Sequence, residues 1–149
     1  MINPPSPSRI YPDAPRPAVG AVVFNGGAVL LVRRANPPAR GTWAIPGGSI
    51  RLGETLQAAA EREILEETGV VIRAKDPVFV FEAILRDDRG RVKYHYVIVD
   101  LAADYLSGDP QAAGDAADAR WITPDEMTGL RVNPATRRLL AEKFNFGQP

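Results

Sequence analysis

Three glutamates crowd into one short stretch of the chain. Glu63, Glu66 and Glu67 lie within residues 62–70, between apolar residues and a glycine. In a helix, at about 100° per residue, Glu63 and Glu67 lie one turn apart on one face with Glu66 beside them, so that their like charges repel. A hard divalent cation with oxygen ligands would offset this repulsion. The stretch therefore favours a magnesium site.

The position of these glutamates on the helical wheel strengthens this interpretation. The arc that holds Glu63 and Glu67 is otherwise apolar, and it is set by Leu56, Ala59, Ala60 and Ile64. Unpaired charges on a face that should pack against a core are costly. The alternative is a solvated acidic end of a helix, as most glutamate-rich stretches are, and the wheel weighs against it.

A glycine-rich turn precedes the predicted helix. Pro46, Gly47 and Gly48 follow a short apolar run, and Gly53 comes just before a helix expected over residues 54–68. Glycine allows the backbone to approach a ligand closely. A carbonyl of Gly47 or Gly48 is therefore a further candidate oxygen ligand for the metal.

The spacing of these residues matches a known motif at every defined position. It runs from Gly48 through five residues to Glu54, then through seven residues to Arg62-Glu63-Ile64-Leu65-Glu66-Glu67-Thr68-Gly69-Val70. This segment resembles the Nudix box, and the resemblance to Nudix hydrolases extends over roughly residues 18–144. It implies an α/β fold, an α/β/α sandwich with a mixed β-sheet. It also implies hydrolysis of a nucleoside diphosphate linked to another moiety, by water activated with Mg²⁺ or Mn²⁺.

The resemblance also assigns roles to single residues. It implies a metal shell made of the Gly47 carbonyl, Glu63, Glu66 and Glu67, and it places Arg62 on a carboxylate of the helix. Glu63, Glu66 or an acid from a later loop would orient or deprotonate the attacking water.

Three residues outside the box complete the candidate site. Asp115, in the loop of residues 108–119, is the first choice for the loop acid and Asp118 is the second, although both are also ordinary loop residues. Arg34 is the candidate for a substrate phosphate, with a solvated strand end as the alternative. Trp43 is a candidate for stacking on a base, while packing in the core is the more common role of a large aromatic residue.

The substrate is less closely defined than the bond that is cleaved. Residues 94–100 resemble a bacterial group of the family that is often labelled ADP-ribose pyrophosphatase, which favours ADP-ribose or a nucleotide sugar. A sanitising (deoxy)nucleoside triphosphate pyrophosphatase is the alternative enzyme. A non-catalytic nucleotide-sensing module is the alternative of another class.

Composition bounds the class of protein. The 149 residues are 45% hydrophobic and 24% charged with a net charge of zero, which is ordinary for one globular domain. The zero net charge disfavours a nucleic-acid partner, and no apolar run reaches membrane-spanning length. The chain has no cysteine and one histidine, which weakens covalent nucleophilic alternatives. We therefore expect a cytoplasmic protein. The resemblance implies an enzyme with a small nucleotide substrate, and a homodimer is a candidate assembly because members of the family often dimerise.

The expected organisation is a proline-rich arm over residues 1–17 and a Nudix hydrolase domain over residues 18–149. We expect strands over residues 18–24, 28–33, 44–45, 78–85, 91–101 and 120–122, with a hairpin turn over residues 87–90. We expect helices over residues 54–68, 124–127 and 134–144, with Asn133 as the cap of the last.

Overall fold

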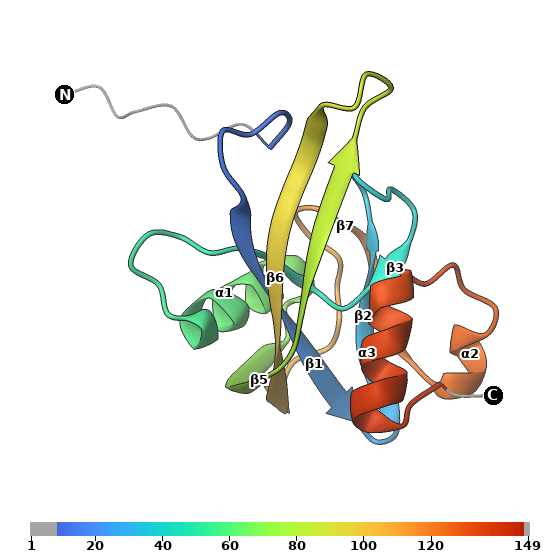
Figure 1. The fold of residues 1–149 in the computed structure, drawn as a ribbon. Helices are drawn as coiled ribbons and strands as arrows, with labels where there is room; N and C mark the ends of the chain where they lie inside the picture. The colour runs from blue at the N-terminus through green and yellow to red at the C-terminus, as the bar shows by residue number, and fades with distance from the viewer. Residues whose placement is uncertain (1–8, 148–149) are drawn as a thin grey trace.

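The computed structural model describes residues 9–147. Its strands are β1 (Arg16–Asn25), β2 (Ala28–Arg34), β3 (Trp43–Ala44), β4 (Gly47–Ser49), β5 (Val71–Arg86), β6 (Val92–Ser107) and β7 (Ala116–Ile122), and its helices are α1 (Leu56–Thr68), α2 (Pro124–Met127) and α3 (Pro134–Phe144). The strands lie between α1 on one side and α3 on the other (Figure 1). The predicted α/β fold with a mixed sheet is confirmed.

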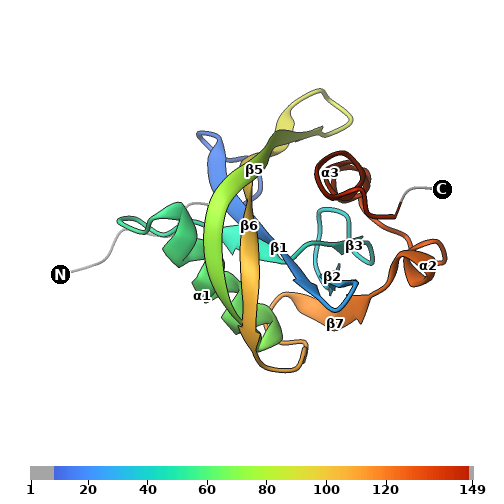
Figure 2. The ribbon, with the colours of Figure 1, turned by 90° about the horizontal axis from the view of Figure 1, so that it is seen from below.

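Strand β1 connects all parts of the sheet. Its residues Arg16–Val23 pair in parallel with Tyr96–Ala103 of β6, and its residues Ala18–Gly20 pair antiparallel with β4. Its last two residues pair antiparallel with β2, which in turn pairs with β3 and β7. The resulting order is β3-β2-β1-β6-β5, with β4 added at β1 and β7 added at β2. Figure 2 shows the long β5–β6 pair standing between α1 and the region of β3 and α3.

The two faces of the sheet pack against different helices. On the α1 side, Ile64 contacts a cluster that includes Val19, Ala21 and Val23 of β1. On the α3 side, Val22 belongs to a second cluster with Leu139 and Leu140. Successive residues of a strand point to opposite faces. The apolar run of β1 therefore supplies both cores, and it holds the layers together.

Capping residues and turn residues mark the ends of the helices and the turn of the β5–β6 hairpin. Thr55 caps α1 by accepting a hydrogen bond from the Ala58 N–H, and Gly69 ends the helix with a φ of 73° in the left-handed region. Helix α3 has the predicted bounds with Asn133 as its cap. The predicted turn of residues 87–90 joins β5 to β6.

The structure differs from the predicted strands at β4, β5, β6 and β7. β7 begins at Ala116, so Asp118, which was predicted in the loop of residues 108–119, lies in this strand, where it pairs with Arg33 of β2. β5 and β6 have 16 residues each and extend well beyond the predicted residues 78–85 and 91–101. The polar stretch before Val78 breaks the apolar alternation, yet its backbone still pairs with β6 across several bulges. β4 was predicted as a loop because its sequence is Gly-Gly-Ser, and pairing with β1 makes it a strand.

The described part of the predicted N-terminal arm lies against the β5–β6 hairpin, while residues 1–8 lie outside the described residues. The backbone N–H of Tyr11 donates to the Lys93 carbonyl at 2.8 Å, and its hydroxyl donates to Asp87 at 2.9 Å. β1 begins at Arg16, inside the stretch predicted as arm. The boundary between arm and domain at residue 17 stays a prediction.

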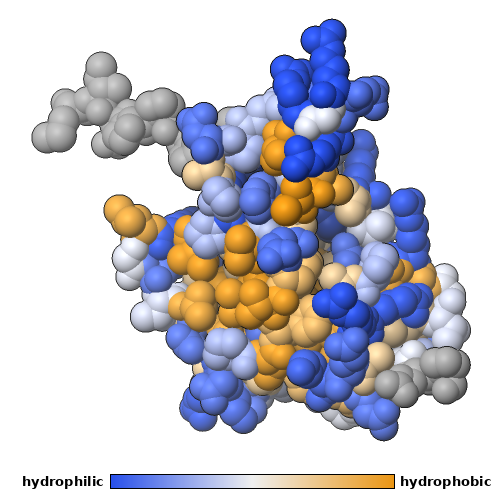
Figure 3. All heavy atoms as spheres, in the orientation of Figure 1, coloured by the Kyte–Doolittle hydropathy of each residue, from blue (hydrophilic) through white to orange (hydrophobic). Residues whose placement is uncertain are grey.

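The outer surface of the β5–β6 pair is partly apolar. Hydrophobic atoms gather over the middle of these strands, whereas the tip of the hairpin is hydrophilic (Figure 3). Val80, Ile84 and Leu85 of β5 are exposed. The predicted homodimer stays a prediction. No helix in residues 9–147 has the length and apolarity needed to cross a bilayer.

The packing of α1 on the sheet gives a first testable prediction. Ile64 is fully buried, whereas its neighbour Leu65 is 52% exposed. We expect Ile64→Ala to lower the free energy of unfolding by about 2–5 kcal/mol through lost burial and a residual cavity, and Leu65→Ala to lower it by about 0.5 kcal/mol or less. Urea unfolding of both variants measures the difference. Equal losses would contradict this packing of α1.

Candidate active site

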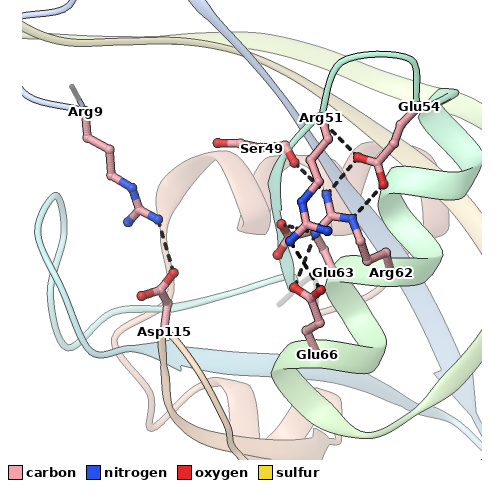
Figure 4. Close-up of polar contacts among 8 residues, drawn as sticks. All are labelled: Arg9, Ser49, Arg51, Glu54, Arg62, Glu63, Glu66 and Asp115. Carbon is pink, nitrogen blue, oxygen red and sulfur yellow. Dashed lines mark hydrogen bonds and ion pairs between the residues drawn. The ribbon is translucent and has the colours of Figure 1, made fainter. Parts of the chain in front are cut away.

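Arg62 makes a dense set of contacts with the acidic residues around it. Its guanidinium donates to both carboxylate oxygens of Glu54 at 2.6 and 2.8 Å, to Glu63 at 2.9 Å and to Glu66 at 3.2 Å. It also donates to the Ser49 carbonyl at 3.0 Å. Figure 4 shows Arg62 among these carboxylates at the side of α1. Arg62 was expected to hold a carboxylate of the helix, and it holds two of them together with Glu54 from the loop before the helix.

Glu54 therefore serves to position Arg62. Hydrogen bonds from Arg62, with a further one from the Arg51 N–H, lower the pKa of Glu54 to about 2. The two parallel bonds between guanidinium and carboxylate fix the orientation of both groups. From the sequence we expected a cation to offset the repulsion among the glutamates of the helix. Arg62 offsets a part of this repulsion.

Glu67 stands apart from this network. Its side chain is buried, and burial, together with the charge of Glu63 and of Asp115, raises its pKa to about 8. A hydrogen bond from the Gly47 N–H and the charge of Arg34 act in the opposite direction but are weaker. A carboxyl group on the inner face of the helix is thus left outside the Arg62 network, and burial favours its protonated form.

These residues border a cavity of about 380 Å³. Its lining includes most of the residues proposed from the sequence, although they come from different elements, namely Arg34, Gly47, Glu63, Glu67 and Asp115. A surface hollow of this size, with charged groups converging at one end, is typical of a small-molecule site.

Gly48 is required at its position by close packing. A Cβ atom there would overlap the carboxyl group of Glu63. β4 and α1 approach each other at this point, and glycine leaves the room in which the Glu63 carboxyl lies. The glycine turn thus positions a candidate ligand as well as offering carbonyl groups.

The loop acid chosen from the sequence lies at the cavity. Asp115 accepts a hydrogen bond from the Asn36 side chain at 3.0 Å and forms an ion pair with Arg9 at 3.4 Å. Asp118 instead pairs with Arg120 at 3.1 Å and is not among the residues that border the cavity. The structure therefore brings the first choice, and not the second, to the site.

Arg34 also lies where it was expected. It borders the cavity, and its Nε donates to the Pro38 carbonyl at 2.8 Å, which directs the guanidinium along the loop after β2. Its neighbour Arg33 is exposed on the opposite side of the strand.

Two further proposed site residues, like Arg62, are not among the residues that border the cavity. Glu66 is half-exposed and pairs with Arg51 at 3.6 Å and with Arg62. Trp43 is 4% exposed and packs in the α3-side core, with the Arg120 guanidinium 4.7 Å from its ring centre. Its position favours packing over the stacking on a base that we considered, because its ring is enclosed by protein.

The carboxylates fit a hard cation in their chemistry but form no closed cluster. In residues 9–147, no three acidic, histidine or cysteine side chains converge closely enough to enclose a metal ion. Glu63 and Glu67 do face the same cavity as the Gly47 backbone, and carboxylate and carbonyl oxygens are the ligands that Mg²⁺ prefers. The metal shell proposed from the sequence stays a prediction.

Sequence reasoning gave no role to one acidic residue of this cavity. Asp100 of β6 is 2% exposed and borders the cavity, and burial raises its pKa to about 7. The available signal was a carboxylate that follows the apolar run of residues 97–99 on the same strand face as Tyr96 and Ile98.

Comparisons with known proteins agree with this geometry. The model of the NUDIX domain matches residues 14–143. An ADP-ribose pyrophosphatase of Methanocaldococcus jannaschii is 35% identical over 116 residues, which are 78% of this chain and 66% of that protein. The nucleoside triphosphatase NudI of Enterobacter sp. is 32% identical over 137 residues, covering 86% of this chain and 96% of that protein.

A solved structure supports the same conclusion. The MutT NUDIX hydrolase of Burkholderia pseudomallei is 28% identical and superposes with a TM-score of 0.74 over 88% of this chain and 99% of that chain. Nudix hydrolases generally need divalent metal ions and act on small nucleotide substrates. The family model, the relatives and the fold together show that this chain belongs to the Nudix hydrolase family.

Proposed function

We propose that this Nudix hydrolase cleaves the pyrophosphate bond of ADP-ribose or a similar nucleotide sugar. The observation that carries the proposal is the composition of the cavity, whose charged end holds Glu63, Glu67 and Arg34 and whose other part is lined by apolar and aromatic side chains. Such a cavity suits a substrate with a polyanionic centre and a flat nucleoside. The similarity to an ADP-ribose pyrophosphatase supports this choice of substrate.

The charged end supplies the groups that this reaction needs. Glu63, Glu66 and Glu67, with the Gly47 carbonyl, would hold Mg²⁺ or Mn²⁺. When bound, such a cation neutralises phosphate charge and lowers the pKa of a coordinated water. Arg62 keeps Glu63 and Glu66 oriented through its hydrogen bonds.

Arg34 and Asp115 would contact the substrate phosphate and the attacking water. Arg34 would pair with a phosphate oxygen, which its guanidinium fits. Asp115 is available to accept the proton of the attacking water, with Glu63 and Glu66 as the alternatives. Deprotonation by a group within hydrogen-bonding reach of the water is a common contribution to such hydrolysis.

A nucleoside triphosphate pyrophosphatase is the second candidate. The similarity to NudI over 96% of its length favours it. The two activities release different products: AMP with a sugar phosphate from ADP-ribose, and a nucleoside monophosphate with pyrophosphate from a triphosphate.

A substrate panel with magnesium tests the proposal. We expect ADP-ribose or a nucleotide sugar to give the highest kcat/KM, and dinucleoside polyphosphates and deoxynucleoside triphosphates to be poorer substrates. Chromatographic identification of the products assigns the bond that breaks. Preferential release of pyrophosphate would favour the second candidate, and binding without turnover of any compound would favour a nucleotide-sensing module.

Substitution of the glutamates tests their proposed roles. We expect Glu63→Gln, Glu66→Gln and Glu67→Gln each to lower kcat by about 10²-fold or more, because each removes a charge that stabilises the reaction centre. Glu61→Gln, on the same helix but outside the cavity lining, is the matched control and should stay within about twofold of the wild type. Full activity of all three variants would refute a metal site on α1.

The raised pKa of Glu67 predicts how metal binding depends on pH. Glu67 must lose its proton before it can bind a cation, so magnesium affinity should rise with pH and level off above about 8. The rise should approach tenfold per pH unit below that value. Calorimetric titration between pH 6 and pH 9 measures it. Glu67→Gln should remove this dependence, and a wild-type affinity that is constant over the range would contradict the assignment.

A further inference from the structure

The carboxyl group of Asp100 is buried without a protein partner. Asp100 is 2% exposed, and within residues 9–147 no hydrogen bond or ion pair involves its side chain. In the same residues, every fully buried side-chain nitrogen or oxygen atom has a partner. The Asp100 carboxyl therefore reaches the open space of the cavity that it borders.

The residues around Asp100 leave room for its carboxyl group. Its cross-strand neighbour on β1 is Gly20, and a Cβ atom at that position would overlap the Asp100 carboxyl group. Tyr96 and Ile98, on the same face of β6, border the same cavity, as does Phe81 of β5. The result is an apolar, partly aromatic compartment with one carboxyl group in it.

This compartment adjoins the charged end within one cavity. A nucleotide whose phosphates lie at Glu63, Glu67 and Arg34 would extend its nucleoside into the remaining space. Apolar and aromatic walls suit the flat faces of a base. The buried carboxyl then needs a hydrogen-bond donor from the ligand, because a polar group removed from water without a partner is costly.

We propose that Asp100 is a specificity-determining residue that hydrogen-bonds the exocyclic amino group of the substrate's nucleobase. The inference rests on the proposed function, since it assumes a nucleotide in the cavity. An ionised carboxylate has two acceptors and matches the two adjacent N–H donors of guanine. A neutral carboxyl has one donor and one acceptor and matches the amino edge of adenine or cytosine.

Bases without an amino group fit this carboxyl less well. Hypoxanthine has a carbonyl oxygen where adenine has its amino group and only a hydrogen atom where guanine has its amino group, and uracil has a carbonyl oxygen where cytosine has its amino group. A carbonyl opposite a carboxylate oxygen repels it, and the buried acceptor remains unpaired. The pairs AMP and IMP, GMP and IMP, and CMP and UMP each differ at the amino group, which makes them matched probes.

Calorimetric binding of these nucleotides in the presence of magnesium tests the inference independently of turnover. We expect the wild type to bind the amino member of at least one pair about tenfold more tightly or better. Asp100→Ala should reduce that ratio to within about threefold. Asp104→Ala, on the same strand, is the matched control, because Asp104 pairs with Lys75 outside the cavity, and it should keep the wild-type ratio.

A second variant distinguishes the two modes of recognition. The amide of Asp100→Asn keeps one acceptor and gains a donor, so it should retain a preference for adenine or cytosine and lose one for guanine. If Asp100→Asn retained a preference for guanine and lost one for adenine or cytosine, the inference would be overturned. Equal weakening of every nucleotide by Asp100→Ala, or a wild type with no amino preference, would also overturn it. If the protein bound nucleotides with an exocyclic amino group more tightly but hydrolysed none, the proposed function would be refuted. The inference on Asp100 would still hold.

Discussion

The guanidinium of Arg62 donates to Glu54, Glu63 and Glu66 at once, and the placement of α1 against the glycine turn depends on these contacts. A bond to the Ser49 carbonyl extends the same network to β4. The planar fork of arginine holds several acceptors in fixed directions, which a lysine does not do. The network therefore orders the helix, the loop before it and the strand beside it as one unit.

Arg62 contacts some of the carboxyl groups of α1 and not others. Glu67, one turn beyond Glu63, lies outside the network and is buried, and its pKa rises to about 8 because burial penalises its ionised form. Arg62 pairs with Glu54, Glu63 and Glu66, whereas the Glu67 carboxyl borders the cavity outside this network. A cation bound there would meet oriented ligands, which reduces the cost of organising the site.

Strand β1 has the corresponding role for the backbone. It pairs with β6 and β4 along its first part and with β2 at its end, and this joins the two halves of the sheet around the cavity. Gly20 and Gly48 lie where β1 and β4 approach acidic side chains, and each leaves room for a carboxyl group. The room for the Glu63 and Asp100 carboxyl groups thus depends on glycines in paired strands.

The sequence by itself determined the features that arise from neighbouring residues. The spacing of Glu63 and Glu67, the cap at Asn133 and the turn of residues 87–90 depend on local geometry, and the structure has all three as predicted. The family motif likewise lies within one continuous segment. Only the tertiary structure decided that β4 is a strand, because its pairing partner is distant in sequence.

The tertiary structure also decided which candidates share one cavity. It brings Arg34 from the end of β2 and Asp115 from the loop before β7 to the cavity that Glu67 borders, and it leaves Trp43 in the core. It turns Asp100 of β6 into the same space, and the strand pattern alone does not show which residues share that space. The physical reason is that burial and charge environment depend on elements packed from across the chain, whereas residue types and spacing depend only on neighbours.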